Sequence, residues 1–578
     1  MSAPTVEGEG TRLERLVPGV AALRGYDRAW LRADVVAGLV LAAILVPQGM
    51  AYAELAGLPA VTGLYTTMAC LVGYALMGAS RVLVLGPDSS VSPLIFAAIL
   101  PLGATNDPGT AIALAGMLAI LTGLMLVGIG VAKLGFVADL LSKEVQVGYM
   151  NGLGITIIVG QLPKLCGFST DADTFVDEVK AFFANIEQTS PTTLALGLAT
   201  LAVLLLLPLV TRKLPAILIA IVGATVVTAV LDLSAKGVDT VGALPQGLPT
   251  PQLPWTQAGD IGPLLLAAFG ITLVSLTDTI ATSTSFGARR GEDVRPDQEM
   301  IGLGTANLAA GLFQGFSVST SGSRTAVAEQ SGSKSQLTGL VGAGVVAILL
   351  LFLNGLLADL PQTALAAVVI TAALSLMDFS ALARYWRVRR TAFSLSVVAS
   401  LGVIFFGVLQ GILIAIVLSI FLFFRRNWWP HGAVLGRASD GSWHDVTADI
   451  EVTEEPGIVV YRWEAPLFFA NASLFHDQVR KLVRKRQARW VILQCEAITD
   501  IDVTAAEMLD QADKQLNARG VHLAFVELRG RLQDLVLRYG LLETLDRDHF
   551  YPSMDAALAD IRALDARHGS ETGSPGDG

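Results

Sequence analysis

The dominant feature of the sequence is a succession of apolar blocks that runs from about residue 34 to residue 424. A helix that crosses the hydrocarbon core of a bilayer needs about 20 mostly apolar residues. Only 16% of the 578 residues are charged, whereas soluble domains contain roughly 25% charged residues. The chain is therefore predicted to be a multi-spanning membrane protein that is surrounded by the lipid bilayer.

The apolar blocks fall into two groups by length. The first group is long enough to cross a bilayer: 34–55, 60–79, 109–130, 144–164, 192–211, 214–232, 262–286, 335–356, 361–377, 391–407 and 409–425. The second group is shorter or is interrupted by Gly, Pro and Ser: 83–101, 299–315 and 317–331. Together they predict an α-helical polytopic membrane protein with fourteen embedded segments.

The distribution of Lys and Arg between the segments predicts the orientation, because cytoplasmic loops carry an excess of these residues. With the N-terminus inside the cell, the outward loops hold Lys164, Lys180 and Lys236. The cytoplasmic side then holds a much larger set: Arg12, Arg15, Arg24, Arg28, Arg32, Lys133, Arg212, Lys213, Arg289, Arg290, Arg295, Lys334, Arg384, Arg387, Arg389, Arg390, Arg425 and Arg426. We expect both termini to be cytoplasmic, in a multi-pass protein of the cell (plasma) membrane.

The pattern changes from Asp449 onward, where short strand-like runs alternate with helical periodicity. In chain order the segments are 458–463 (strand), 473–489 (helix), 491–493 (strand), 523–526 (strand), 532–539 (helix) and 554–564 (helix). Such alternation predicts a small cytosolic α/β domain. The predicted organisation is therefore a cytosolic arm (1–33), a transporter domain (34–425, with repeats over about 34–232 and 260–425), a linker (426–447), the α/β domain (448–565) and a disordered tail (566–578).

Charge and cysteine usage exclude several function classes. The formal net charge of −10 argues against a nucleic-acid partner, because phosphate binding favours a basic surface. Cys70, Cys166 and Cys495 are scattered without metal-ligand spacing. Because no nucleophile–base pair, metal cluster or phosphate-binding loop is present, we expect neither an enzyme nor a bound cofactor.

Two interrupted segments occupy matching places in the two halves of the transporter domain. In the first half, the apolar run 82–85 leads into Gly86-Pro87-Asp88-Ser89-Ser90, and an apolar helix follows. In the second half, the run 316–320 leads into Ser321-Gly322-Ser323-Arg324 and another helix. Each is the third segment of its half, and substrate sites of secondary transporters lie where such broken helices meet.

Two facing helix starts suit a small oxyanion. A helix N-terminus carries about half a positive charge and several unpaired N–H donors, so a facing pair of them can hold an anion. The alternative is that Asp88, Ser89, Ser321 and Ser323 are ordinary N-caps. The matched positions inside membrane segments favour the anion site.

Two ionisable residues, Asp278 and Arg324, stand within or beside apolar segments. A charge at that depth is costly and is seldom without function. Asp278 is a candidate for binding a coupling cation or carrying a proton. The alternative is a structural Asp278–Arg324 ion pair.

The sequence resembles the sulfate permease (SulP) family of anion transporters from about residue 30 to residue 565. The matching stretches are Asp34–Leu39 (DVVAGL), Val46–Ala53 (VPQGMAYA), Ala56–Pro59 (AGLP), Gly63–Tyr65 (GLY) and the serine-rich turn that ends in Ser323 and Arg324. The resemblance implies a seven-plus-seven inverted repeat with substrate between the third and tenth segments. The residues implied to bind substrate are Gln48, Tyr52, Ser89, Ser90, Ser321, Gly322, Ser323 and Arg324.

The same resemblance bears on the coupling ion. Some bacterial relatives have a proton-coupling acid at the position of Gln48, which this chain lacks. Sodium-coupled bicarbonate relatives carry an Asp and, four residues later, a Thr on the eighth segment. Asp278 and Thr282 match that spacing, so the possible coupling ions are Na⁺ and H⁺.

The C-terminal domain resembles a STAS domain at Asp500–Ala506 (DIDVTAA). Anti-sigma-factor antagonists have Asp-Ser-Ser-Gly there and are phosphorylated on a serine. Val503 and Ala505 break that pattern, so we expect a structural or dimerising role and a homodimer. The overall expectation is secondary active transport of a small inorganic anion, sulfate first. Bicarbonate or dicarboxylate transport, or a channel-like anion sensor, are the alternatives.

Overall fold

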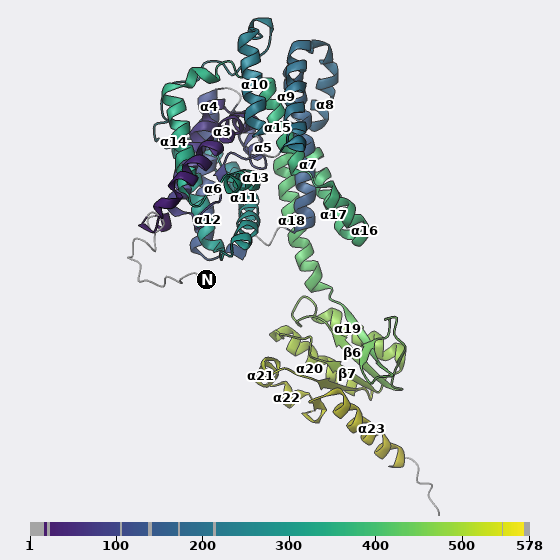
Figure 1. Cartoon of the computed structure of the whole chain (residues 1–578). Helices are drawn as coiled ribbons and strands as arrows, with labels where there is room; N and C mark the ends of the chain where they lie inside the picture. Colours follow the sequence, from purple (N-terminus) through teal and green to yellow (C-terminus); the bar gives the residue numbers. More distant parts are fainter. Residues whose placement is uncertain are drawn as a thin grey trace, which may run out of the picture. The chain divides into compact units, whose positions relative to one another are not determined.

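The computed structural model describes residues 17–19, 24–104, 107–136, 142–170, 174–211, 215–545 and 547–571. The chain divides into two compact units, Met1–Ile420 and Phe421–Gly578, and each is described by itself (Figure 1). Most of the N-terminal arm predicted over 1–33 lies outside the described residues, as do residues 572–578 of the predicted tail.

The first unit is helical, and each of the fourteen predicted segments coincides with an element of the structure. In chain order these are α3 (Leu31–Leu55), α4 (Ala60–Met77), β1 (Leu85–Gly86) with α5 (Ser92–Ile99), α6 (Pro108–Val131), α7 (Lys143–Cys166), α9 (Pro191–Val210), α10 (Ala216–Val230), α11 (Ile261–Arg290), α12 (Pro296–Leu312), β2 (Ser319–Thr320) with α13 (Gly322–Gln330), α14 (Leu337–Phe352), α15 (Gln362–Leu376), α17 (Arg390–Phe406) and α18 (Val408–Trp428). Among the described residues, six helices are long and apolar enough to cross a membrane by length and composition.

Helix contacts between the two halves of this unit occur in equivalent pairs. Helix α3 packs against α14, and the equivalent pair with the halves exchanged, α11 and α6, is also in contact. The same holds for α4 with α14 and α12 with α6, and for α7 with α17 and α15 with α9. Helices α4 and α12, the second segments of the two halves, pack against each other. The predicted seven-plus-seven arrangement is therefore confirmed.

Small residues bring the backbones of these helices together, as is common in membrane proteins. A Cβ atom at Gly63 of α4 would lie 1.9 Å from the carbonyl oxygen of Gly49 in α3. A Cβ atom at Gly304 of α12 would lie 2.8 Å from the carbonyl oxygen of Gly123 in α6. Glycine is required at such crossings because any side chain would force the helices apart.

The buried carboxylate of Asp34 ties the start of α3 to the loop before α14. It accepts hydrogen bonds from the backbone N–H groups of Lys334 (2.7 Å) and Ser335 (3.1 Å). It also accepts from the hydroxyls of Ser335, Thr338 and Tyr26. A buried charge with this many donors is well compensated. The acid that opens the Asp34–Leu39 stretch therefore joins the two halves.

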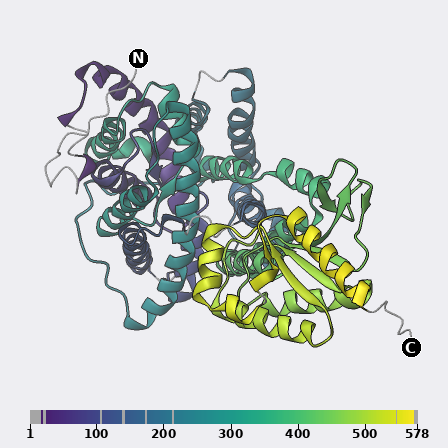
Figure 2. The same ribbon diagram turned by 90° about the horizontal axis from the view of Figure 1, so that it is seen from below.

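The second unit is an α/β domain built on one sheet (Figure 2). The sheet order is β4-β3-β6-β7-β8-β9, with β5 paired to β3; the strands are β3 (Gly432–Ala438), β4 (Trp443–Asp445), β5 (Val452–Thr453), β6 (Ile458–Trp463), β7 (Trp490–Gln494), β8 (His522–Val526) and β9 (Phe550–Tyr551). Strands β6 to β9 run parallel, and β3 is antiparallel to β6. The helices are α19 (Ala472–Arg486), α20 (Val503–Asn517), α21 (Gly530–Arg538), α22 (Leu541–Thr544) and α23 (Met554–Glu571). The predicted α/β fold is confirmed.

Alternate residues of the strands enter two apolar cores, as expected for a sheet covered on both faces. One core joins Val459 and Val491 to side chains of α19 and α20, such as Phe475 and Leu509. The other joins Ile492 of β7 to side chains of α23 that include Leu558 and Ile561.

The structure corrects two predicted boundaries. The range 426–447, predicted to be a linker, contains the end of α18 and strands β3 and β4. Strand β3 belongs to the sheet because Val434 and Leu435 are buried and pair with Tyr461 and Val460 of β6. At the other end, α23 continues to Glu571, so residues 566–571 of the predicted tail are helical.

Candidate anion site

A short pairing between the two halves joins the interrupted segments. Strand β1 pairs antiparallel with β2, with Leu85 opposite Thr320 and Gly86 opposite Ser319. Helix α5 follows β1 and helix α13 follows β2, while α11 contacts both α5 and β2. The pairing brings the two predicted clusters, 86–90 and 321–324, to the same place in the fold.

In the first cluster, the carboxylate of Asp88 is hydrogen-bonded to Ser90, two residues later in the chain. Its Oδ2 atom accepts hydrogen bonds from the backbone N–H of Ser90 (3.0 Å) and from the hydroxyl of Ser90 (2.7 Å). The N-cap of α5 is Val91, and no side-chain hydrogen bond caps it. Asp88, Ser89 and Ser90 are all buried. Asp88 and Ser89 are therefore not side-chain caps of α5.

In the second cluster, Ser321 occupies the N-cap position of α13 without a side-chain capping bond. Its hydroxyl lies 3.1 Å from that of Ser323 instead. Gly322 and Ser323 are exposed. The start of α13 thus presents two hydroxyls beside backbone N–H donors, which is an arrangement that suits an anion.

Arg324 is 2% exposed, and its guanidinium lies across the first cluster. Its Nη2 atom is 3.4 Å from Oδ1 of Asp88 and 3.5 Å from the carbonyl oxygen of Gly86. A Cβ atom at Gly86 would lie 2.7 Å from Nη1. Arg324 therefore pairs with Asp88. The structural Asp278–Arg324 pair, which the sequence left open as an alternative, is wrong. The β1–β2 pairing sets Asp88 opposite the start of α13 instead.

Asp278 of α11 approaches the first cluster from a third element. Its Oδ2 atom is 3.2 Å from the hydroxyl of Ser90, and its Oδ1 atom accepts a hydrogen bond from the amide of Gln146 (3.3 Å). Thr282, one turn later, lies beside the second cluster, since its hydroxyl is 4.0 Å from a Cβ built on Gly322. Gln146 of α7 is not among the site residues predicted from the sequence, although a polar side chain within an apolar segment is a signal for such a residue.

Helix α3 contributes Gln48 and Tyr52, which are one turn apart and buried. The Tyr52 hydroxyl lies beside Ser89 and within the electrostatic reach of Asp88 and Arg324. The Oε1 atom of Gln48 has no hydrogen-bond partner among the described residues. Tyr52 therefore joins the site, and Gln48 precedes it by one turn of the same helix.

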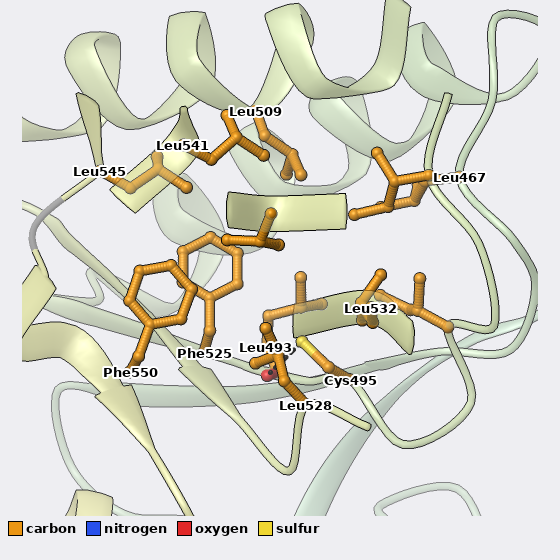
Figure 3. A pocket seen from close by; sticks show the side chains of 13 residues that line it. Leu467, Leu493, Cys495, Leu509, Phe525, Leu528, Leu532, Leu541, Leu545 and Phe550 are labelled. Carbon is orange, nitrogen blue, oxygen red and sulfur yellow. Dashed lines mark hydrogen bonds between the residues drawn. The ribbon is translucent and has the colours of Figure 1, made fainter. Parts of the chain in front are cut away.

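A separate cavity lies in the α/β domain (Figure 3). Its lining is apolar and includes Leu493, Phe525 and Leu532 around the thiol of Cys495. Burial raises the pKa of that thiol well above its usual value. Because no charged side chain lines this cavity, it does not fit an anion.

The arrangement in the first unit is that of a membrane transport protein: two inverted halves, with broken segments that meet at polar clusters. The sequence pattern of the sulfate permease family matches residues 31–399, and that of the STAS domain matches residues 449–557. The chain belongs to the sulfate permease family, which comprises anion transporters and not enzymes.

One curated relative and two solved structures are similar to this chain over most of their own length. A probable sulfate transporter of Mycobacterium tuberculosis (strain CDC 1551) is 40% identical over 94% of this chain and 98% of its own length. The murine Slc26a9 anion transporter in the inward-facing state is 23% identical, with a TM-score of 0.87 over 97% of this chain and 96% of its own. The transmembrane domain of the cyanobacterial bicarbonate transporter BicA is 23% identical, with a TM-score of 0.60 over 68% and 98%.

Proposed function

We propose that this protein is a secondary active transporter of a small inorganic anion, with sulfate as the principal substrate. The anion binds between the starts of α5 and α13, and alternating access carries it across the bilayer. The observation that supports this most is the joining of both polar clusters, by the β1–β2 pairing, around the buried cation of Arg324. The 40% identity to a probable sulfate transporter favours sulfate.

The charges of the site favour coupling to a cation at Asp278. Arg324 supplies one positive charge, whereas Asp88 and Asp278 supply two carboxylates. The Ser90 hydroxyl has one proton to donate, and it lies closer to Asp88 than to Asp278. The second carboxylate is stabilised when it carries a proton or when a sodium ion neutralises it. Thr282, on the same face of α11, offers a hydroxyl oxygen to such an ion.

Bicarbonate is the second candidate substrate, because Asp278 and Thr282 match the spacing of sodium-coupled bicarbonate relatives. A dicarboxylate is a third candidate. A channel-like anion sensor differs from all of these because its flux would not saturate, whereas a carrier shows saturation and competition between substrates.

The test is uptake by the purified protein in liposomes, with labelled sulfate or bicarbonate and imposed sodium or proton gradients. We expect saturable sulfate uptake that one of the gradients drives. Ser323→Trp, which places a bulky side chain at the start of α13, and Arg324→Ala, which removes the cation, should both abolish uptake by folded protein. Uptake at the unmodified rate by both variants would remove the substrate site from this location.

The cellular arrangement is proposed on the same basis. The loop charges favour a plasma-membrane protein with both termini in the cytoplasm. The altered STAS turn at Val503 and Ala505 favours a dimerising role of the C-terminal domain over a phosphorylation switch. Crosslinking in native membranes tests the dimer, and labelling of terminal tags in intact cells tests the orientation.

A further inference from the structure

The cation of the proposed site, Arg324, already has an acidic neighbour within the chain. The charged groups that the described elements bring to this place are Arg324 of α13, Asp88 before α5 and Asp278 of α11. Tyr52 from α3 lies within the electrostatic reach of Asp88, and Tyr149 from α7 lies within that of Asp278. With both carboxylates ionised the site has a net charge of about −1, which opposes the entry of an anion.

The two partners in the Arg324–Asp88 pair are unequally satisfied. Asp88 is held by two hydrogen bonds from Ser90, independently of the arginine. Arg324 has five N–H donors, and the acceptors found for them among the described residues are those of Nη2, at 3.4 and 3.5 Å. These distances exceed the roughly 2.7–2.9 Å of a strong charge-assisted bond. Nη1 has no partner among the described residues.

A guanidinium that is 2% exposed and has unused donors indicates a missing acceptor. Asp88 would stay bonded to Ser90 if Arg324 turned to another acceptor, because its bonds come from its own turn. The pair is thus able to open at little cost to the carboxylate. A purely structural ion pair would instead have short bonds that satisfy both partners.

We propose that Asp88 is an internal substitute for the transported anion, which occupies Arg324 when the site is empty and competes with the substrate for it. This inference rests on the proposed function of the site. Asp88 stabilises the buried cation between transport cycles, and it weakens anion binding enough for release. It also makes the site less favourable for divalent anions than for monovalent ones, since repulsion scales with the charge of the ligand.

The experiment is equilibrium binding of labelled sulfate to purified full-length protein, with chloride as competitor and gluconate as the background anion. Removal of one fixed charge in Asp88→Asn should tighten sulfate binding by about tenfold and chloride binding by about threefold, because the logarithm of the gain scales with valence. Asp107→Asn removes an exposed carboxylate that caps α6 and should change neither affinity.

Several outcomes would overturn the proposal. Folded Asp88→Asn protein that binds sulfate no more tightly than the unmodified chain would show that Asp88 does not compete. Equal gains for sulfate and chloride would show that charge is not responsible. Failure of Asp88→Asn to fold in saturating sulfate, with or without rescue by Arg324→Gln, would make the pair structural, because bound sulfate should replace the missing counter-ion. If the unmodified chain binds no sulfate saturably, the proposed function itself fails.

Discussion

The crossing of α3 and α4 offers a sharp test of how packing supports the site. In Gly63→Ala, the new Cβ atom would lie 1.9 Å from the carbonyl oxygen of Gly49, and this gap has to widen to at least 3.0 Å. The obstacle is backbone, so no side-chain rotation relieves it. Overpacking of this kind costs about 1–3 kcal/mol, against a gain of about 0.5–1 kcal/mol for Ala over Gly in a helix.

The displacement also reaches the proposed site, because Tyr52 follows Gly49 by one turn of α3. Shifts on the order of 1 Å can cost up to about 10²-fold in enzyme turnover, and we expect sulfate uptake to fall about tenfold. Thermal unfolding in detergent and uptake into liposomes measure the two effects.

The matched control is Gly128→Ala in α6, where an added Cβ meets nothing within 4 Å. This variant should be neutral or up to about 1 kcal/mol more stable. If Gly63→Ala matches the control in both melting temperature and uptake, the close helix crossing is not required for stability or transport.

Four further predictions concern other parts of the chain. Asp278→Asn should abolish gradient-driven accumulation while downhill exchange persists; a folded variant that still accumulates sulfate contradicts the coupling role. Asp34→Asn weakens a buried acceptor and should lower the free energy of unfolding by about 1–3 kcal/mol. An unchanged melting temperature would refute this role of Asp34. Arg486 lowers the pKa of Glu454 below its ordinary value of 4.5. The pair's contribution, under about 1 kcal/mol, is therefore fully present above that pH and is lost as pH falls through the lower, folded pKa. Arg486→Gln should destabilise the protein at about pH 4.5 and above, and the difference should shrink as the pH falls further, as unfolding against pH will show. Truncation after Trp429, before β3, should leave a unit that inserts, and loss of membrane insertion would refute that boundary.

The helical segments could be predicted because membrane insertion depends on local composition. A run such as 109–130 has to be apolar along its whole length, and α6 occupies almost the same residues, Pro108–Val131. The boundary errors have a different origin. Strand β3 contains Gly432 and Gly436, which weaken the strand pattern in the sequence. Its membership in the sheet depends on a partner, β6, about 25 residues later.

The ion pair of the site was missed although the sequence contained the signal for it. The sequence left a structural Asp278–Arg324 pair open as an alternative, whereas the partner of Arg324 is Asp88, 236 positions away. The inverted repeat already predicted that the cluster 86–90 faces the cluster 321–324. An acid in one cluster and a base in the other should then meet, because a buried charge is stable only when it is compensated. Within a repeat fold, equivalent positions in the two halves are therefore a better guide to buried ion pairs than separation along the chain.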